Sequence, residues 1–97
     1  MAKDPLVRCE VVFRGHVQGV GFRYTTMVVA KYYPVTGYVM NVRDGTVHMV
    51  AEGTKSSVSG MIRRLQDELG SYITDQTQSW QPATGEFQGF ETRHEGP

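Results

Sequence analysis

The residues of this chain best suited to chemistry form a glycine-rich turn that ends in an arginine, Gly15-His16-Val17-Gln18-Gly19-Val20-Gly21-Phe22-Arg23. Glycine permits positive φ and lets a ligand approach the backbone without meeting a Cβ. The amides of such a turn, when it precedes a helix, converge near the positive end of the helix dipole. Arg23 adds a permanently charged, forked donor that suits a phosphoryl group. Because the turn contains no Cys, Ser or Thr, we expect it to bind a phosphoryl group and not to attack one.

Asn41, in the β-rich run that enters the predicted hairpin, is the second candidate. Its side chain has an acceptor and a donor, so it could hold a water molecule beside a bound phosphoryl group. The alternative for Asn41 is a turn residue with no chemical role. The alternative for Arg23 is a solvated charge, but a cation at a helix N-terminus is unfavourable unless an anion meets it.

The histidines are the remaining candidates for acid–base or metal chemistry. His16 lies inside the turn and could be a general base or a metal ligand, although a role in lining the loop is favoured. His48 and His94 have no companions at the spacing of zinc ligands. We therefore expect neither a metal site nor a cofactor.

Hydrophobic periodicity predicts the elements that position the turn. The first half of the chain reads as a strand over 7–14, a helix over 22–33 ended by Pro34, and strands over 36–43 and 46–52. A two-residue hairpin at Asp44-Gly45 is expected to join the last two strands.

The second half of the chain is expected to hold one helix and two further strands. Thr54 is a plausible N-cap, and Gly70 can end the helix. The apolar residues of this helix recur at spacings of three and four: Val58, Met61, Ile62, Leu65 and Leu69. Residues 72–80 read as a polar edge strand and 87–93 as a short final strand, with a turn at Pro82 and Gly85.

This order of elements predicts an α+β fold, the ferredoxin-like βαββαβ sandwich, with two helices on one face of a four- to five-stranded antiparallel sheet. Residues 1–6 are expected to form a flexible tail, and residues 7–95 a single domain. Cys9 falls in the alternating run of the first strand and is expected to be a small core residue.

Composition limits the classes of partner. Ten basic and ten acidic residues in 97 leave no net charge, so no general attraction to nucleic acid or to an anionic membrane is expected. One cysteine cannot form an internal disulfide. We find no apolar signal region and no run of membrane-spanning length. A cytoplasmic protein is therefore the expectation.

Several segments together resemble the acylphosphatase family in its small bacterial form. They are the turn at 15–23, Ala30, Gly37-Tyr38-Val39-Met40-Asn41, Asp44-Gly45-Thr46-Val47 and Ala51-Glu52-Gly53. The resemblance is close over residues 9–53 and looser as far as Gly89-Phe90-Glu91. Tyr38 stands where the family usually has Trp, and Ser71 follows Gly70 where a proline is frequent; both differences concern packing.

The resemblance implies hydrolysis of carboxyl–phosphate anhydrides without a metal or cofactor. Arg23 and Asn41 would be catalytic, with Asn41 orienting the attacking water. The phosphate would be bound by the loop and the arginine: His16, Val17, Gln18, Gly19, Val20, Gly21, Phe22 and Arg23. A monomer that takes a small acyl phosphate as substrate, and inorganic phosphate or sulfate as a competing anion, is expected.

The residues themselves favour the same substrate class. An acyl phosphate expels a carboxylate whose conjugate acid has a pKa of about 4, so its departure needs no general acid. An alkyl phosphate would need a metal or a positioned proton donor, and the candidate site offers neither. Positioning and charge stabilisation could then suffice.

Two binding functions are the alternatives. The turn could serve a non-catalytic binder of anions or phosphopeptides. An RNA-binding ferredoxin-like domain would need aromatic residues on the sheet and a basic surface. Residues 46–52 contain no Phe or Tyr and the net charge is zero, which disfavours RNA.

Overall fold

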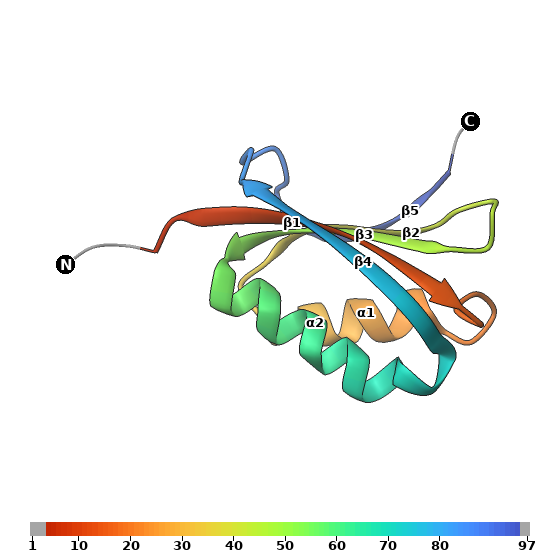
Figure 1. Cartoon of the computed structure of the whole chain (residues 1–97). Helices are drawn as coiled ribbons and strands as arrows, with labels where there is room; N and C mark the ends of the chain where they lie inside the picture. The colour runs from red at the N-terminus through yellow and green to blue at the C-terminus, as the bar shows by residue number, and fades with distance from the viewer. Residues whose placement is uncertain (1–3, 96–97) are drawn as a thin grey trace.

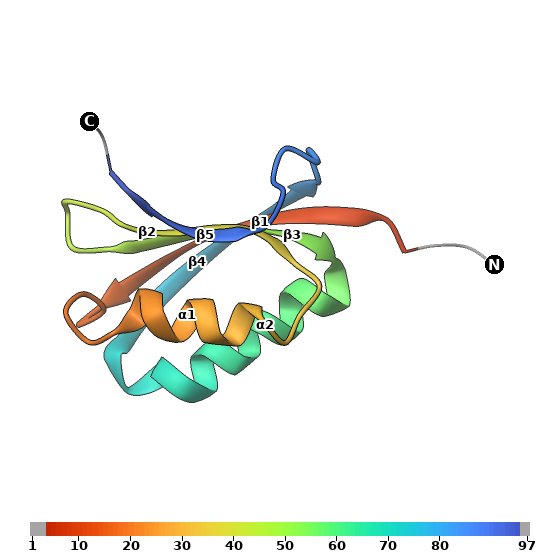
Figure 2. The same ribbon diagram turned by 180° about the vertical axis from the view of Figure 1, so that it is seen from behind.

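Five strands form one sheet in the order β4-β1-β3-β2-β5 in the computed structural model, which describes residues 4–95. The strands are β1 (Leu6–Gly15), β2 (Thr36–Asn41), β3 (Val47–Thr54), β4 (Ile73–Pro82) and β5 (Phe90–His94). The helices are α1 (Phe22–Ala30) and α2 (Lys55–Leu69), and a 3₁₀ turn spans Gly70–Tyr72. Both helices cover the same face of the sheet (Figure 1; Figure 2). The predicted ferredoxin-like α+β fold is confirmed.

The sheet is mixed and not wholly antiparallel as expected. β1 pairs antiparallel with β3 and β4, and β2 with β3, but β5 runs parallel to β2. The cause is the connection after β4, which ends at Pro82 opposite Val7, at the end of the sheet where β2 begins. The chain crosses the sheet at that end and enters β5 in the direction of β2, held by a hydrogen bond from the Gly37 amide to the Gly89 carbonyl.

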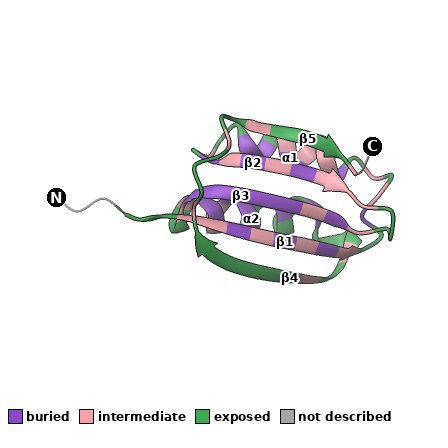
Figure 3. Ribbon diagram, turned by 90° about the horizontal axis from the view of Figure 1, so that it is seen from above, coloured by how far each residue is buried: buried purple, intermediate pink, exposed green. Residues whose placement is uncertain are grey.

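The core lies between the helices and the central strands. All five apolar residues predicted for the inner face of α2 are buried: Val58, Met61, Ile62, Leu65 and Leu69. Cys9 is fully buried in β1, as expected, and burial raises the pKa of its thiol to about 11. β3 is almost wholly buried, whereas β4 is an exposed edge strand, which confirms its predicted polar character (Figure 3).

Two helix ends differ from expectation. α1 ends at Ala30 instead of Tyr33, and the amides of Tyr32 and Tyr33 donate to carbonyls three residues earlier. These shorter-range hydrogen bonds replace the α-helical ones before Pro34, because the residue before a proline is disfavoured in the α region. α2 ends before Gly70 as predicted, but Gly70 keeps right-handed helical dihedrals and begins the 3₁₀ turn. Thr54 is the N-cap of α2, as predicted, and accepts from the Ser57 amide at 3.2 Å.

Residues 42–46 separate β2 from β3, and the hydrogen bond from the Val42 amide to the Thr46 carbonyl leaves three of them in the turn, not the expected two. The Gly45 amide donates to the Val42 carbonyl at 3.0 Å, and Gly45 has φ +94°. Asp44 does not have positive φ, so a type I′ turn, which needs it at both central positions, is ruled out. Glycine instead occupies the position after the turn, where the chain re-enters the strand.

Leu6, which was expected in the tail, already pairs with Thr54 in β1. Residues 1–3 of that tail lie outside the described residues.

No helix within residues 4–95 has the length and apolar character needed to cross a lipid bilayer.

Candidate active site

Apolar anchors fix the loop between β1 and α1 at both ends. Val17 is fully buried, and Val20 packs against the core cluster. Phe13 lies in β1 and Phe22 is the first residue of α1, and the centroids of their rings are 5.0 Å apart. The apolar side chains of the loop therefore pack into the core and fix its position. The backbone of the loop is left to form a binding surface.

The loop amides are available to a ligand. Gly19 and Gly21 both have φ +78°, a conformation that glycine adopts without strain. Gly21 is the N-cap of α1 and supplies no side-chain cap. The first helical hydrogen bond runs from Thr25 to the Gly21 carbonyl, and no amide from Val17 to Tyr24 donates to another group within residues 4–95. Unpaired donors at a helix N-terminus favour an anion.

Arg23 and Asn41, the two predicted catalytic residues, meet in one pocket of about 220 Å³. The pocket is lined by the loop, the first turn of α1 and the end of β2: Val17, Gly19, Gly21, Phe22, Arg23, Tyr24 and Asn41. The side-chain oxygen of Asn41 is buried and has no hydrogen-bond partner within the described residues. A buried acceptor without a partner lowers the stability of a protein. A ligand that donates a hydrogen bond to this atom would therefore bind favourably.

Gln18 explains why the loop and the end of β2 lie together. Its side-chain amide donates to the carbonyl of Val42 at 2.6 Å and to that of Thr46 at 2.9 Å. The loop is thereby tied to both sides of the β2–β3 hairpin. Val42 follows Asn41 directly, so this clamp sets the position of Asn41 relative to the loop.

Three residues of the predicted phosphate-binding set do not line the pocket. The Gln18 side chain serves the clamp, and Val20 packs on the core. His16 is exposed, and its amide donates to the Tyr72 carbonyl at 2.9 Å. That hydrogen bond uses the only donor that the His16 backbone has, so His16 has no free amide to offer a ligand.

Tyr24 lines the pocket but was not identified from the sequence. It is 75% exposed, on the outer side of α1. Sequence periodicity separates buried from exposed helix faces, but it does not tell which exposed side chain borders a pocket. Its position directly after Arg23 was the one available signal.

Comparison with known proteins agrees with this geometry. The family model described as Acylphosphatase matches residues 9–92. The chain belongs to the acylphosphatase family. A protein named acylphosphatase from Nocardia farcinica is 40% identical over 93 residues, which are 95% of this chain and 92% of the relative. An acylphosphatase from Thermobifida fusca is 36% identical, over 90% of this chain and 97% of the relative.

A solved acylphosphatase structure is also similar. The crystal structure of acylphosphatase from Bacillus subtilis has a TM-score of 0.83 and 26% identity, over 90% of this chain and 98% of that chain. Membership of the acylphosphatase family favours the hydrolase over the RNA-binding alternative. The residues that the family model matches, 9–92, include the loop, Arg23 and Asn41.

Proposed function

We propose that this acylphosphatase hydrolyses acyl phosphates in the pocket between the loop and β2, by direct attack of an oriented water. Arg23 and the amides of the loop residues that line the pocket bind the phosphoryl oxygens and stabilise the charge that they carry in the transition state. Asn41 accepts a hydrogen bond from the attacking water and fixes its direction toward phosphorus.

In the proposed step the water oxygen forms a bond to phosphorus as the bond from phosphorus to the acyl oxygen breaks. The electron pair of that bond leaves with the acyl oxygen, which becomes a carboxylate. One proton of the water passes to an oxygen of the phosphoryl group itself, and the other stays on the attacking oxygen. The products are a carboxylate and inorganic phosphate, and neither a metal nor a cofactor is needed, because the leaving carboxylate is already a weak base.

The observation that carries this proposal is the buried Asn41 oxygen without a partner, in the same pocket as Arg23. A pocket built only to hold an anion would need donors, which Arg23 and the amides supply. An acceptor has no favourable contact with a phosphoryl oxygen. It suits a donor such as water placed beside the phosphoryl group.

A coupled assay that follows the hydrolysis of benzoyl phosphate tests the proposal. We expect turnover that inorganic phosphate and sulfate inhibit competitively, since each would occupy the anion site. Saturable binding of phosphate without turnover of any acyl phosphate would instead identify a non-catalytic anion binder.

The proposal includes a monomer that works in the cytoplasm. The pocket of a single chain already contains both groups to which the reaction is assigned, Arg23 and Asn41, which supports a monomer. A chain with one cysteine is in keeping with a reducing compartment. Gel filtration with light scattering, and fractionation of cells that express the protein, test these two points.

A further inference from the structure

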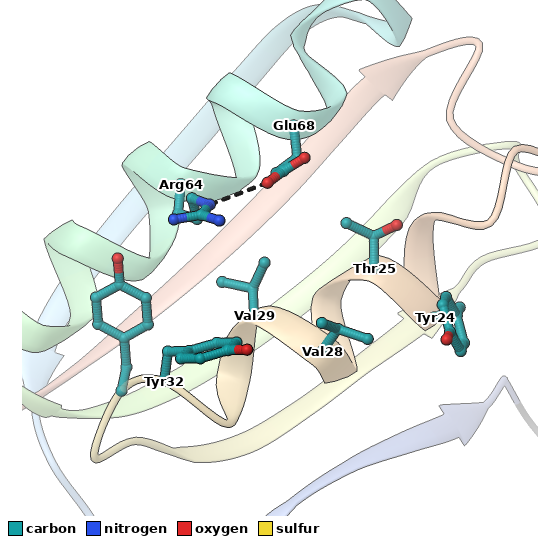
Figure 4. A pocket seen from close by; sticks show the side chains of 8 residues that line it. Tyr24, Thr25, Val28, Val29, Tyr32, Arg64 and Glu68 are labelled. Atoms are coloured by element: carbon teal, nitrogen blue, oxygen red, sulfur yellow. Dashed lines mark hydrogen bonds and ion pairs between the residues drawn. The ribbon is translucent and has the colours of Figure 1, made fainter.

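A second pocket opens along the groove between α1 and α2 (Figure 4). It encloses about 230 Å³, close to the volume of the phosphoryl pocket. Its lining residues come from α1, the turn after α1, and α2, and none comes from a strand. The groove therefore lies in the helix layer, on the side of α1 away from the sheet.

The two pockets share one residue, Tyr24. Tyr24 lies in the first turn of α1, next to Arg23, and forms the border between them. The groove therefore adjoins the candidate active site at Tyr24. A ligand whose phosphoryl group is held by Arg23 would reach the groove by passing this side chain.

An apolar stripe runs along the groove from this border. Tyr24, Val28 and Tyr32 follow one another at intervals of four residues, so they lie on one side of α1 and of the turn that continues it. They are 75%, 37% and 78% exposed. Figure 4 shows them along α1, with Arg64 and Glu68 on α2 across the groove. The two tyrosines are thus mostly exposed, whereas Val28 is covered over more than half of its surface.

The charged side chains of the groove neutralise each other. Arg64 and Glu68 are the ones that line it within the described residues, and they form an ion pair at 3.0 Å. A negatively charged acyl group would have to compete with Glu68 for the arginine. The groove is consequently suited to an uncharged, apolar ligand, and Tyr24 offers a ring on which an aromatic group can stack.

The geometry of phosphoryl transfer also favours placing the acyl group in the groove. The attacking and leaving oxygens lie roughly in line on opposite sides of phosphorus. Asn41 belongs to β2, so a water bound to it would approach phosphorus from the side of β2. The acyl oxygen would then leave on the opposite side of phosphorus, and the groove that adjoins the pocket at Tyr24 is the space proposed for it.

We propose that the α1–α2 groove binds the acyl group of the substrate, and that Tyr24 and Val28 select acyl phosphates with aromatic or apolar acyl groups. This inference rests on the proposed function, because it assigns the part of the substrate that the phosphoryl pocket does not hold. Tyr24 is a specificity-determining residue in this account, and Arg23 and Asn41 perform the chemistry.

The test compares kcat/KM for benzoyl phosphate and acetyl phosphate in the wild type and in the variants Tyr24→Ala and Val28→Ser. We expect the benzoyl-to-acetyl ratio to fall by about tenfold in Tyr24→Ala and by a smaller factor in Val28→Ser. The difference in intrinsic reactivity of the two substrates cancels when ratios are compared between proteins. Trp80→Ala is the control, because Trp80 is an exposed aromatic on β4 that lines neither pocket, and its ratio should equal that of the wild type.

Two further measurements keep the outcomes distinct. The inhibition constant of inorganic phosphate, which has no acyl group, should be the same in wild type and Val28→Ser; Val28 does not line the phosphoryl pocket. An unchanged benzoyl-to-acetyl ratio in both groove variants would overturn the inference and leave the hydrolase intact. Absence of turnover of either substrate by the wild type would overturn the proposed function itself.

Discussion

The side-chain amide of Gln18 donates a hydrogen bond of 2.6 Å to the carbonyl of Val42. Gln18 belongs to the loop between β1 and α1, and Val42 directly follows Asn41, the last residue of β2. The same amide also donates to Thr46 across the hairpin. One side chain therefore fixes the distance between the two halves of the site, which come from segments more than twenty residues apart in the sequence.

Replacement of Gln18 by Ala should loosen this clamp without removing any group that contacts the substrate. We expect kcat to fall by about tenfold to a hundredfold, because a small misplacement of the water is costly. The affinity for inorganic phosphate should change much less, since Arg23 and the amides remain. Steady-state kinetics and phosphate inhibition separate the two effects, and Gln66→Ala, at an exposed position of α2, is the matched control. A variant with unaltered kcat would show that the clamp has no part in positioning Asn41.

Arg23→Ala should reduce kcat/KM by at least about a hundredfold, because a preorganised donor to the transition-state charge is lost. Arg23→Lys should recover little of this loss, since an ammonium cannot reproduce the two parallel hydrogen bonds of a guanidinium. Circular dichroism checks that both variants fold. Arg63→Ala, which removes an exposed arginine of α2, should retain full activity. Substantial activity in Arg23→Lys would mean that charge alone is sufficient.

Chelation of metal ions should leave the rate unchanged. The leaving carboxylate needs no Lewis acid, and Arg23 supplies the positive charge at the phosphoryl group. Hydrolysis of benzoyl phosphate is measured before and after dialysis against EDTA, and again after Mg²⁺ is added back. A loss of rate that Mg²⁺ restores would contradict this part of the mechanism.

Glu52, far from the chemistry, should govern acid stability. Its carboxylate is buried and accepts hydrogen bonds from the amides of Thr84 and Gly85, from the Thr84 hydroxyl and from Arg8. Burial alone would raise the pKa of Glu52, but these donors together hold it below its ordinary value of 4.5. The stabilisation is therefore present above pH 4.5 and is lost as the pH falls through the lower pKa of the folded protein.

Glu52→Gln should lower the free energy of unfolding at pH 7 by about 2 kcal/mol, as expected for hydrogen bonds to a buried charge. The difference from the wild type should shrink below the ordinary pKa of the carboxyl. Urea denaturation at several pH values measures it. Glu86→Gln alters a more exposed carboxylate bound to the same Arg8. It should lower the free energy of unfolding by less than Glu52→Gln does. An equal cost for both variants at every pH would refute the role given to Glu52.

Periodicity in the sequence was sufficient to predict the order of elements and the buried face of α2, because burial there depends on spacing along one helix. It was also sufficient to place Arg23 at a helix start. Features that depend on distant segments were not predictable. The parallel pairing of β5 follows from where β4 ends, and the engagement of the His16 amide follows from the position of Tyr72. The clamp by Gln18 and the border role of Tyr24 likewise need the folded chain.

Asn41→Ala provides the most direct test of the central claim, that a water held by the Asn41 side chain attacks the phosphoryl group. The account predicts that kcat for benzoyl phosphate falls by about a hundredfold to a thousandfold, while the inhibition constant of inorganic phosphate stays close to that of the wild type. If Asn41→Ala keeps most of its kcat, or loses phosphate binding and turnover together, Asn41 does not orient the water and the proposed mechanism is wrong.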